Sequence, residues 1–245
     1  MGITVGLFGM SGDGKTTSTI INKDGSYKYL TPEYNGIDPK SHMIINLDKK
    51  RLPFPSNQWS KESKNYTETS DIDVIKKAIE FAAKNPLIKS ISLDTINIYL
   101  AYKEYNDRKK LTFDNWRDVA NDVIELNTLC NTVLRNDQIA YIMGHVELIT
   151  DTDGKEKKVL SVIGKKSKRQ MPEGFYPICL FTEMEYGDNG ENKHYFLTKA
   201  AGSSGKTPIG MFNDFRIPNS LALVDETIRK YYGIETESIS KEEKK

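Results

Sequence analysis

Phosphate chemistry is suggested by Gly9, Gly14, Lys15 and Thr16, which are spaced as G-x-x-x-x-G-K-[ST] after an apolar stretch beginning at Val5. In loops of this pattern, backbone N–H groups surround phosphate oxygens, the lysine reaches the β and γ oxygens, and the hydroxyl ligates Mg²⁺. A helix is predicted over residues 16–21, and its positive end would face the same anion. We therefore expect the phosphates of a nucleotide to be bound by Gly9, Ser11, Gly12, Asp13, Gly14, Lys15, Thr16 and Thr17.

A carboxylate that could complete a metal site follows later in the chain. A buried strand is predicted over residues 87–93, and Asp94 stands at its end. A carboxylate in this position can hold Mg²⁺ through its water shell, although a strand-ending aspartate is also a common turn former. The phosphate loop needs a partner carboxylate for its metal. We therefore expect Asp94 and Thr16 to be the magnesium ligands.

Two further polar residues follow predicted strands. Glu33 lies in a polar turn after a strand predicted at 27–30, and His145 follows a strand predicted at 138–143. Ligands bind at the carboxyl ends of the strands in an open parallel sheet. We expect Glu33 to activate water and His145 to sense the γ-phosphate. A turn carboxylate and a structural histidine are the alternatives.

The composition favours one α/β domain. The chain has 245 residues, of which 38% are hydrophobic and 28% are charged, enough for a sizeable core. We expect this domain over residues 1–234 and a charged, disordered tail over 235–245. Cys130 and Cys179 belong to no C-x-x-C pattern, which favours buried thiols in a reducing compartment. No apolar run approaches the roughly 18 residues of a membrane span, so a soluble, cytoplasmic protein is expected.

The pattern changes along the chain from alternating strands and helices to strands alone. Residues 38–69 give a weak signal, which indicates one strand-like run at 43–47 within a loop or an edge hairpin. Helices are predicted at 70–85, 99–110, 114–135 and 220–232, and antiparallel strands at 146–150 with 159–163 and at 176–186 with 194–199.

Over roughly residues 3–232, the loop GMSGDGKT and the order of the elements resemble the RecA-like P-loop ATPases. They are most similar to the small phage-encoded AAA-type proteins associated with recombination and single-strand annealing. The resemblance implies a mostly parallel central sheet flanked by helices, C-terminal antiparallel hairpins, and ATP with Mg²⁺ as ligands. It also implies that Glu33 is the catalytic glutamate, Asp94 the metal ligand and His145 the sensor, a position where RecA has glutamine.

A basic run follows the sensor and consists of Lys165, Lys166, Lys168 and Arg169. The DNA-binding loop of RecA follows its sensor, so the resemblance implies that this basic run contacts DNA. The formal net charge is only +1, so a polyanion would be held by a local patch and not by the field of the whole molecule. Single-stranded DNA, with a single-strand-binding protein, is the expected partner, and a solvated hairpin surface is the alternative.

RecA-like ATPases work as rings or filaments in which a cation of the next protomer completes the site. The candidates here are Lys199, Lys206 and Arg216, which flank a segment, 200–205, that is predicted to be flexible. We therefore expect a homo-oligomer. For a phage-encoded protein, the compartment would be the cytoplasm of a bacterial host.

Two other functional classes use the same loop, namely a small-molecule kinase and a nucleotide-gated adaptor such as a loader of a replication enzyme. A kinase would need an arginine-rich lid, and the arginines here are sparse and scattered. GTP is disfavoured because residues 22–24 lack the N-K-x-D spacing and come too early. Zinc is disfavoured because the histidines and cysteines lack ligand spacing.

Overall fold

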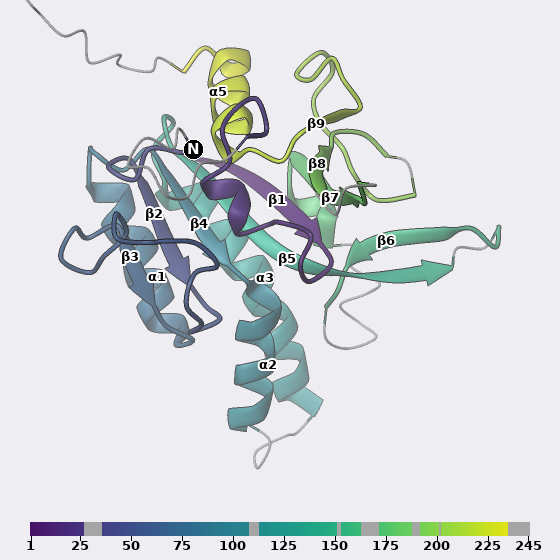
Figure 1. Cartoon of the computed structure of the whole chain (residues 1–245). Helices are drawn as coiled ribbons and strands as arrows, with labels where there is room; N and C mark the ends of the chain where they lie inside the picture. The colour runs from purple at the N-terminus through teal and green to yellow at the C-terminus, as the bar shows by residue number, and fades with distance from the viewer. Residues whose placement is uncertain are drawn as a thin grey trace, which may run out of the picture.

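The computed structural model describes residues 1–26, 36–107, 113–150, 153–162, 172–187, 192–200 and 202–234, and its centre is one nine-stranded sheet (Figure 1). The strands are β1 (Ile3–Gly9), β2 (His42–Asn46), β3 (Tyr66–Glu68), β4 (Ser90–Asp94), β5 (Ile139–Thr150), β6 (Glu156–Leu160), β7 (Ile178–Glu185), β8 (Lys193–Leu197) and β9 (Arg216–Pro218). The helices are α1 (Ile72–Lys84), α2 (Ile96–Asp107), α3 (Phe113–Val133) and α5 (Leu221–Tyr232), with the 3-10 turns η1 (Thr17–Thr19) and η2 (Pro172–Phe175).

The sheet is mostly parallel. Its order is β3-β2-β4-β5-β1-β7-β8-β9, and each neighbouring pair from β3 to β7 runs parallel. β8 and β9 continue the sheet in antiparallel fashion, and β6 pairs antiparallel with the outer part of β5. The predicted α/β fold, with a mostly parallel sheet flanked by helices and antiparallel C-terminal strands, is therefore confirmed.

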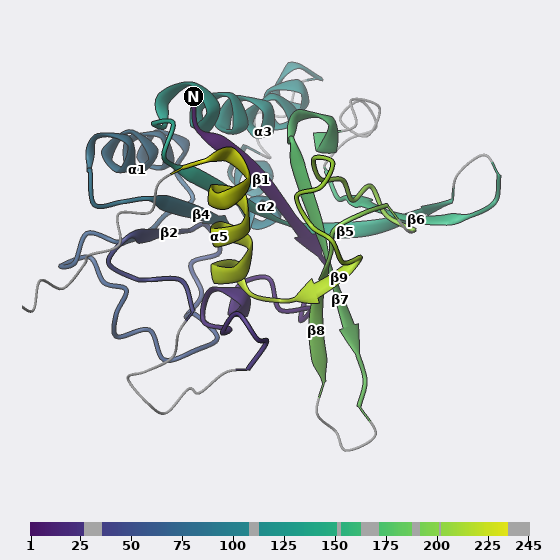
Figure 2. The ribbon, with the colours of Figure 1, turned by 90° about the horizontal axis from the view of Figure 1, so that it is seen from above.

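Helices cover both faces of this sheet (Figure 2). One face packs against α1, α2 and α3 through buried residues such as Ile75, Tyr99 and Leu126. The other face packs against α5 and the connection between β2 and β3, through residues such as Val224 and Trp59. β2 and β4 are buried along their whole length, which is typical of parallel strands covered on both sides.

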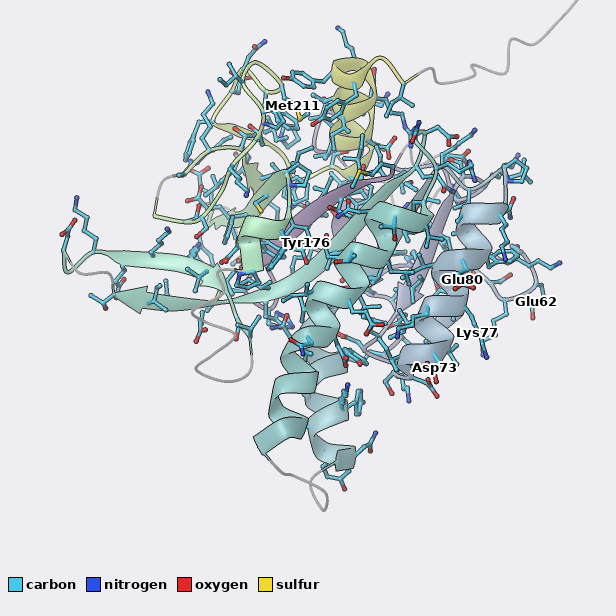
Figure 3. The ribbon with its side chains drawn as sticks, turned by 180° about the vertical axis from the view of Figure 1, so that it is seen from behind. Glu62, Asp73, Lys77, Glu80, Tyr176 and Met211 are labelled. Atoms are coloured by element: carbon cyan, nitrogen blue, oxygen red, sulfur yellow. The ribbon has the colours of Figure 1, made fainter. Side chains whose placement is uncertain are left out.

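The ends of α1 and α5 follow the signals in the sequence. Asp71 caps α1 by accepting hydrogen bonds from two backbone N–H groups, and Ser220 caps α5 by accepting one from Leu223. Gly233 ends α5 with a φ of 64°, in the left-handed region that favours glycine. No helix in the described part of the chain is long and apolar enough to span a membrane. The outer face of α1 carries the exposed Asp73, Lys77 and Glu80 (Figure 3).

The helix predicted over residues 16–21 is wrong, because the structure has only the single 3-10 turn η1 there. The hydroxyl of Thr17 donates to the carbonyl of Gly14 at 3.1 Å, and the hydroxyl of Ser18 donates to the carbonyl of Lys15 at 2.5 Å. Side chains that bond the nearby backbone compete with helix formation. The dipole of a long helix is therefore not available to an anion at this loop.

Of the two alternatives for residues 38–69, a loop or an edge hairpin, the hairpin is wrong, while the strand-like run predicted at 43–47 is confirmed as β2. β2 lies between β3 and β4, and β2 and β3 run parallel. Parallel neighbours need a crossover connection, and here it carries Phe54 and Trp59 onto the same hydrophobic core as α5. β3 forms the edge of the sheet.

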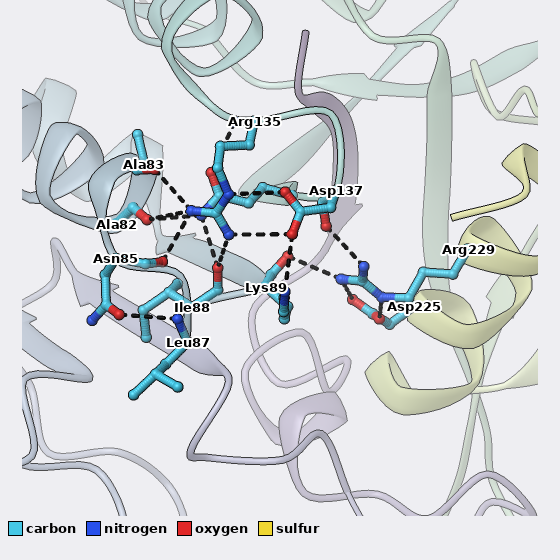
Figure 4. A network of polar contacts seen from close by, with 11 residues as sticks. Ala82, Ala83, Asn85, Leu87, Ile88, Lys89, Arg135, Asp137, Asp225 and Arg229 are labelled. Atoms are coloured by element: carbon cyan, nitrogen blue, oxygen red, sulfur yellow. Dashed lines mark hydrogen bonds and ion pairs between the residues drawn. The ribbon is translucent and has the colours of Figure 1, made fainter. Parts of the chain in front are cut away.

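At the amino-terminal edge of the parallel strands, two arginines tie the helices to the sheet (Figure 4). Arg135 donates to the carbonyl of Asn85, just after α1, at 2.9 Å. Arg229 of α5 donates to the carbonyls of Lys89 and Asp137 at 2.9 and 2.8 Å. This edge is a structural network. The candidate site lies at the opposite edge, where the parallel strands end.

Two parts of the chain project from the sheet (Figure 1). The outer half of β5, from Val146 onward, forms an antiparallel arm with β6 and confirms the predicted hairpin. The helices α2 and α3 contact each other and extend beyond the sheet as a pair. α2 begins two residues after Asp94, and the arm begins directly after His145, so both projections start at the candidate site.

Candidate nucleotide-binding site

The glycines of the loop between β1 and η1 have specific structural roles. A Cβ on Gly9 would lie 1.5 Å from the hydroxyl oxygen of Thr182 in β7. Gly12 and Gly14 have φ angles of 89° and 91°, in the region that side chains other than glycine rarely adopt. Glycine is therefore needed at residue 9 because β7 approaches closely, and at residues 12 and 14 because their backbone angles are left-handed.

The loop offers backbone N–H groups to an anion. The Asp13 carboxylate accepts from the N–H of Met10 at 2.9 Å and from the hydroxyl of Thr182 at 3.3 Å, which ties the loop to itself and to β7. Asp13 was predicted to contact phosphate, but its carboxylate is engaged in holding the loop. Among the described residues, the N–H groups of residues 14–16 find no acceptor in the chain. Consecutive N–H groups beside a left-handed glycine form an anion-binding concavity.

Lys15 folds back over this loop. Its Nζ donates to the carbonyls of Gly9 at 2.9 Å and Met10 at 2.7 Å, and the residue is only 6% exposed. Burial lowers the pKa of Lys15 to about 8, against the opposing charge of Asp94. The ammonium group is thus held beside the concavity by these two hydrogen bonds, and it would have to break them to reach a phosphate.

Thr16 and Asp94, the two predicted metal ligands, are brought into contact. The Thr16 hydroxyl donates to Asp94 Oδ2 at 2.6 Å. The contact spans one strand, because β5 lies between β1 and β4. Burial raises the pKa of Asp94 to about 6, while the bond from Thr16 and the charge of Lys15 act in the opposite direction. The ionised carboxylate of Asp94 is therefore stabilised only in part by its neighbours.

A second carboxylate, Asp48, lies beside Asp94 and was not predicted. Its Oδ1 accepts from the N–H and the hydroxyl of Thr95 at 3.0 and 2.9 Å. Asp48 follows β2, whose last residue Asn46 pairs with Asp94 across the sheet. Its charge contributes to the raised pKa of Asp94. The sequence contained a signal for it, since IINLD at the end of β2 has the same form as SISLD in β4.

His145 stands opposite Gly9 in the sheet register, at the edge where it was predicted. Its Nδ1 lies 3.3 Å from Nζ of Lys15. Burial lowers the pKa of His145, and the charge of Lys15 lowers it further. A neutral ring that accepts a hydrogen bond from Lys15 fits both observations. The imidazole therefore lies within reach of the group that has to move when a phosphate binds.

Asn97, which was not predicted, joins His145 to the arm. The backbone N–H of His145 donates to Asn97 Oδ1 at 2.6 Å, and Asn97 Nδ2 donates to the carbonyl of Ser161 at 2.6 Å. The N–H of Ser161 in turn donates to the carbonyl of His145 at 2.8 Å. A Cβ on Gly144 would lie 3.2 Å from Asn97 Oδ1 and 2.5 Å from a Leu160 methyl group. This closed set of bonds links the sensor position to the end of β6.

The oxygen donors at the site fit Mg²⁺. They are the hydroxyl of Thr16 and the carboxylates of Asp94 and Asp48, and Mg²⁺ prefers oxygen ligands. In the described ranges, no cluster of three or more His, Cys, Asp or Glu side chains could hold a metal alone. Protein Mg²⁺ sites commonly use one or two carboxylates with substrate phosphates and water. Asp94, whose pKa is raised by burial, is the group that a cation would stabilise.

Several predicted functional residues lie outside the described residues. These are Glu33 and the whole basic run, so their positions remain predictions. The residues that flank the basic run, Val162 and Pro172, are buried. The described residues on either side of the basic run therefore lie in the core, and the first of them, Val162, follows Ser161, which bonds to His145.

The lysines proposed to act in trans lie at the surface of the chain. Lys199 and Lys206 are exposed, and Nζ of Lys206 donates to the carbonyl of Gly174 at 3.4 Å. The backbone of Lys206 pairs with Cys179 at 3.0 and 2.7 Å, and Cys179 stands opposite Gly6, before the loop begins. A role for either lysine in a neighbouring protomer remains a prediction.

The segment between these lysines is anchored in its described part, contrary to the flexibility expected for it. Ser203 is 3% exposed. The N–H of Lys158 in β6 donates to the carbonyl of Gly202 at 2.8 Å, and the N–H of Ser204 donates to the carbonyl of Lys158 at 3.2 Å. Arg216 is paired with Glu183 at 2.7 Å. The segment thus covers the outer edge of β6.

Comparisons with known proteins add a fold-level similarity. No family model matches the sequence, and no curated protein sequence matches it. Among solved structures, the chain is similar to a KaiC-like protein from the hyperthermophilic archaeon Pyrococcus horikoshii OT3, with 16% identity, a TM-score of 0.44, and coverage of 84% of this chain and 83% of that one. At this level of likeness, the functional assignment depends on the geometry of the site.

Proposed function

We propose that this protein is a Mg²⁺-dependent ATPase whose nucleotide binds over the loop of residues 9–17. The observation that carries the proposal is the 2.6 Å hydrogen bond between Thr16 and Asp94, with Lys15 stored at the same loop. Two residues far apart in sequence but predicted to share one metal are in contact. That contact depends on the order of the strands, so local sequence alone does not explain it.

The residues have distinct tasks in this proposal. The N–H groups of residues 14–16 bind the phosphate oxygens, and Lys15 moves from the two carbonyls to the β and γ oxygens. The Thr16 hydroxyl and the Asp94 carboxylate hold Mg²⁺, which neutralises charge on the same oxygens when it is bound. His145, beside Lys15, contacts the γ-phosphate and loses that contact when the phosphate leaves. Asn97 transmits the change in His145 to the arm.

Activation of water is assigned to Glu33, and Asp48 is the competing carboxylate among the described residues. Asp48 is already occupied by two hydrogen bonds from Thr95, which favours a positioning role for it. Glu33→Gln should retain ATP binding and lose most of the general-base contribution, typically 10² to 10⁴-fold. Asp48→Asn should reduce turnover less. If the two variants exchange these outcomes, Asp48 is the base.

The proposal extends to DNA through the basic run. The basic run lies between two buried anchors, and the first anchor follows the residues that bond to His145. A change at the γ-phosphate can therefore reach the ends of this segment. We propose that the segment binds single-stranded DNA, in recombination, annealing or replication, together with a single-strand-binding protein. Its lysines would give salt-dependent affinity independent of sequence.

One assay separates this function from its alternatives, namely ATP turnover measured with and without single-stranded DNA. An ATPase that acts with DNA should release phosphate to water, and DNA should change the rate. A kinase would transfer phosphate only to a small acceptor, and an adaptor would bind nucleotide without turnover. Absence of nucleotide binding would reject all three.

The oligomer is part of the same proposal, as a ring or filament in which Lys206 or Lys199 serves the neighbouring site. Trans-acting cations in nucleotide hydrolases contribute about 10³ to 10⁵ in rate. Lys206→Ala and Lys15→Ala proteins, each inactive alone, should recover partial activity when they are mixed. Normal hydrolysis by both Lys206→Ala and Lys199→Ala would remove the trans lysine from the mechanism.

A further inference from the structure

A turn rich in cations follows β2 at the edge of the candidate site. Its residues are Asp48, Lys49, Lys50 and Arg51, and the last three are exposed. The turn is rigid at its base. Asn46 Nδ2 donates to the carbonyl of Lys50 at 2.7 Å, and the N–H of Asp48 donates to Asn46 Oδ1 at 3.1 Å. Asn46 therefore holds the backbone of Lys50 in a fixed place beside Asp94, its partner in the sheet register.

A continuous series of polar contacts runs from Lys50 to the phosphate loop. Nζ of Lys50 lies 4.0 Å from Asp48 Oδ2, and Asp48 Oδ1 accepts from Thr95. The hydroxyl of Thr95 lies 3.3 Å from Asp94 Oδ1, and Asp94 Oδ2 accepts from Thr16 at 2.6 Å. The ammonium group of Lys50 thus lies next to a carboxylate that is linked through Thr95 to Asp94 and Thr16.

The two neighbouring lysines differ in what holds them. Lys49 has a φ of 54°, and its Nζ lies over the ring of Tyr102 in α2, 5.5 Å from the ring centroid. The side chain of Lys50 is 70% exposed, and its one ion pair among the described residues, to Asp48, is at the 4.0 Å limit of such contacts. A lysine on a flexible four-carbon stem can exchange so loose a partner for a phosphate oxygen. Of the two lysines, Lys50 is therefore the one that is available to a ligand.

The charge of Lys50 also acts on His145. Burial lowers the pKa of His145, and the positive charges of Lys15 and, to a lesser extent, Lys50 lower it further. His145 is the residue opposite Gly9 and beside Lys15. Two cations therefore act on the same histidine, Lys15 in contact with it and Lys50 from the turn after β2.

We propose that Lys50 binds the γ-phosphate of the nucleotide from within the same chain, so that this turn distinguishes a nucleoside triphosphate from a diphosphate. The inference rests on the proposed nucleotide site and specifies its ligand. On binding, the ammonium group leaves Asp48 and donates to a γ-phosphate oxygen. A diphosphate has no group at this position and leaves Lys50 with Asp48.

The experiment measures the affinities of ATP and ADP without Mg²⁺ by titration calorimetry, for the wild type and for Lys50→Ala, Lys50→Arg and Lys49→Ala. Lys50→Ala should weaken ATP binding by about tenfold, the typical effect of one charge-assisted hydrogen bond, and leave ADP binding unchanged. Lys50→Arg should restore most of the ATP affinity. Lys49→Ala is the matched control, and it should preserve the preference for ATP.

Two results would overturn the inference while leaving the nucleotide site intact. One is an equal loss of ATP and ADP affinity in Lys50→Ala, which would indicate a structural role. The other is no loss of either. A wild-type protein that binds neither nucleotide, with Mg²⁺ or without it, would reject the proposed function itself, and the inference with it.

Discussion

Replacing Asp94 with asparagine should stabilise the protein in the absence of ligands while removing its metal site. Burial raises the pKa of this carboxyl from 3.8 to about 6. At neutral pH, the folded protein therefore holds an ionised group that is better solvated in the unfolded chain. A difference of slightly more than two pKa units, at about 1.36 kcal/mol per unit, corresponds to as much as about 3 kcal/mol.

The pH dependence gives the effect its signature. The folded state binds the proton of Asp94 more tightly than the unfolded state does, so stability decreases as the pH rises from about 4 to about 6. The advantage of Asp94→Asn should therefore be near its maximum at pH 7.5 and nearly absent at pH 4. The amide oxygen can still accept the hydrogen bond from Thr16, so little packing changes.

Urea unfolding with a chelator, from pH 4 to 8, measures this difference. Asp214→Asn is the control, since residue 214 is exposed and such substitutions usually change stability by less than about 0.5 kcal/mol. With Mg²⁺ and ATP the order should reverse, because the wild type, which keeps the metal site, gains more free energy from ligand binding than the variant does. Equal stability of wild type and Asp94→Asn at pH 7.5 without ligand would refute the reasoning.

Three further predictions concern the fold and the DNA segment. Burial lowers the pKa of His42, held between two serine hydroxyls, to about 3, so the unfolded chain binds its proton more tightly between pH 3 and 6.5. In an Asp94→Asn background, which removes the opposing contribution, stability should fall by about 2 kcal/mol from pH 7 to 5, and His42→Gln should flatten this slope in urea unfolding. Gly9→Ala should lower thermal stability and nucleotide affinity together, since its Cβ would meet the Thr182 hydroxyl at 1.5 Å; unchanged thermal unfolding would contradict the observed geometry. Alanine substitution of the whole basic run should weaken DNA binding for all sequences alike and flatten its salt dependence, and equal binding at low salt would exclude this segment.

Local patterns in the sequence were sufficient for the loop and for Asp94. The glycine spacing depends on backbone angles at Gly12 and Gly14, which are properties of a few adjacent residues. Asp94 could be found because an apolar strand that ends in a carboxylate is visible without knowing its neighbours. The capping residues of the helices α1 and α5 could also be identified from the local sequence.

Residues whose importance depends on strand order could not be found from local patterns. Asp48 lies beside Asp94 because β2 is next to β4 in the sheet. The weak signal of residues 38–69, which indicates only a loop or an edge hairpin, gives no sign of this pairing. Asn97 matters because α2 begins beside His145, more than forty residues away in sequence. Thr182 restricts Gly9 only because β7 pairs with β1. Each of these contacts is non-local, and sequence periodicity contains no information about strand order.

The short turn η1 is a case in which a local pattern in the sequence led to a wrong prediction. The motif predicted a helix after the loop, but the hydroxyls of Thr17 and Ser18 bond backward to the carbonyls of Gly14 and Lys15. In the proposed function, the phosphates are therefore bound by the loop N–H groups and lysine side chains, with little help from a helix dipole. This gives Lys15 a larger share of the binding than it would have in front of a long helix.

The most direct test of the central claim is the binding and hydrolysis of Mg²⁺–ATP by the wild type and by Lys15→Ala, with circular dichroism to establish that both are folded. Among the described residues, the ammonium group of Lys15 contacts only loop carbonyls and His145, so removal of this side chain should leave the fold intact. The account predicts that the wild type binds and hydrolyses ATP, and that Lys15→Ala binds more weakly and has no turnover. A folded Lys15→Ala protein that hydrolyses ATP at the wild-type rate would contradict it.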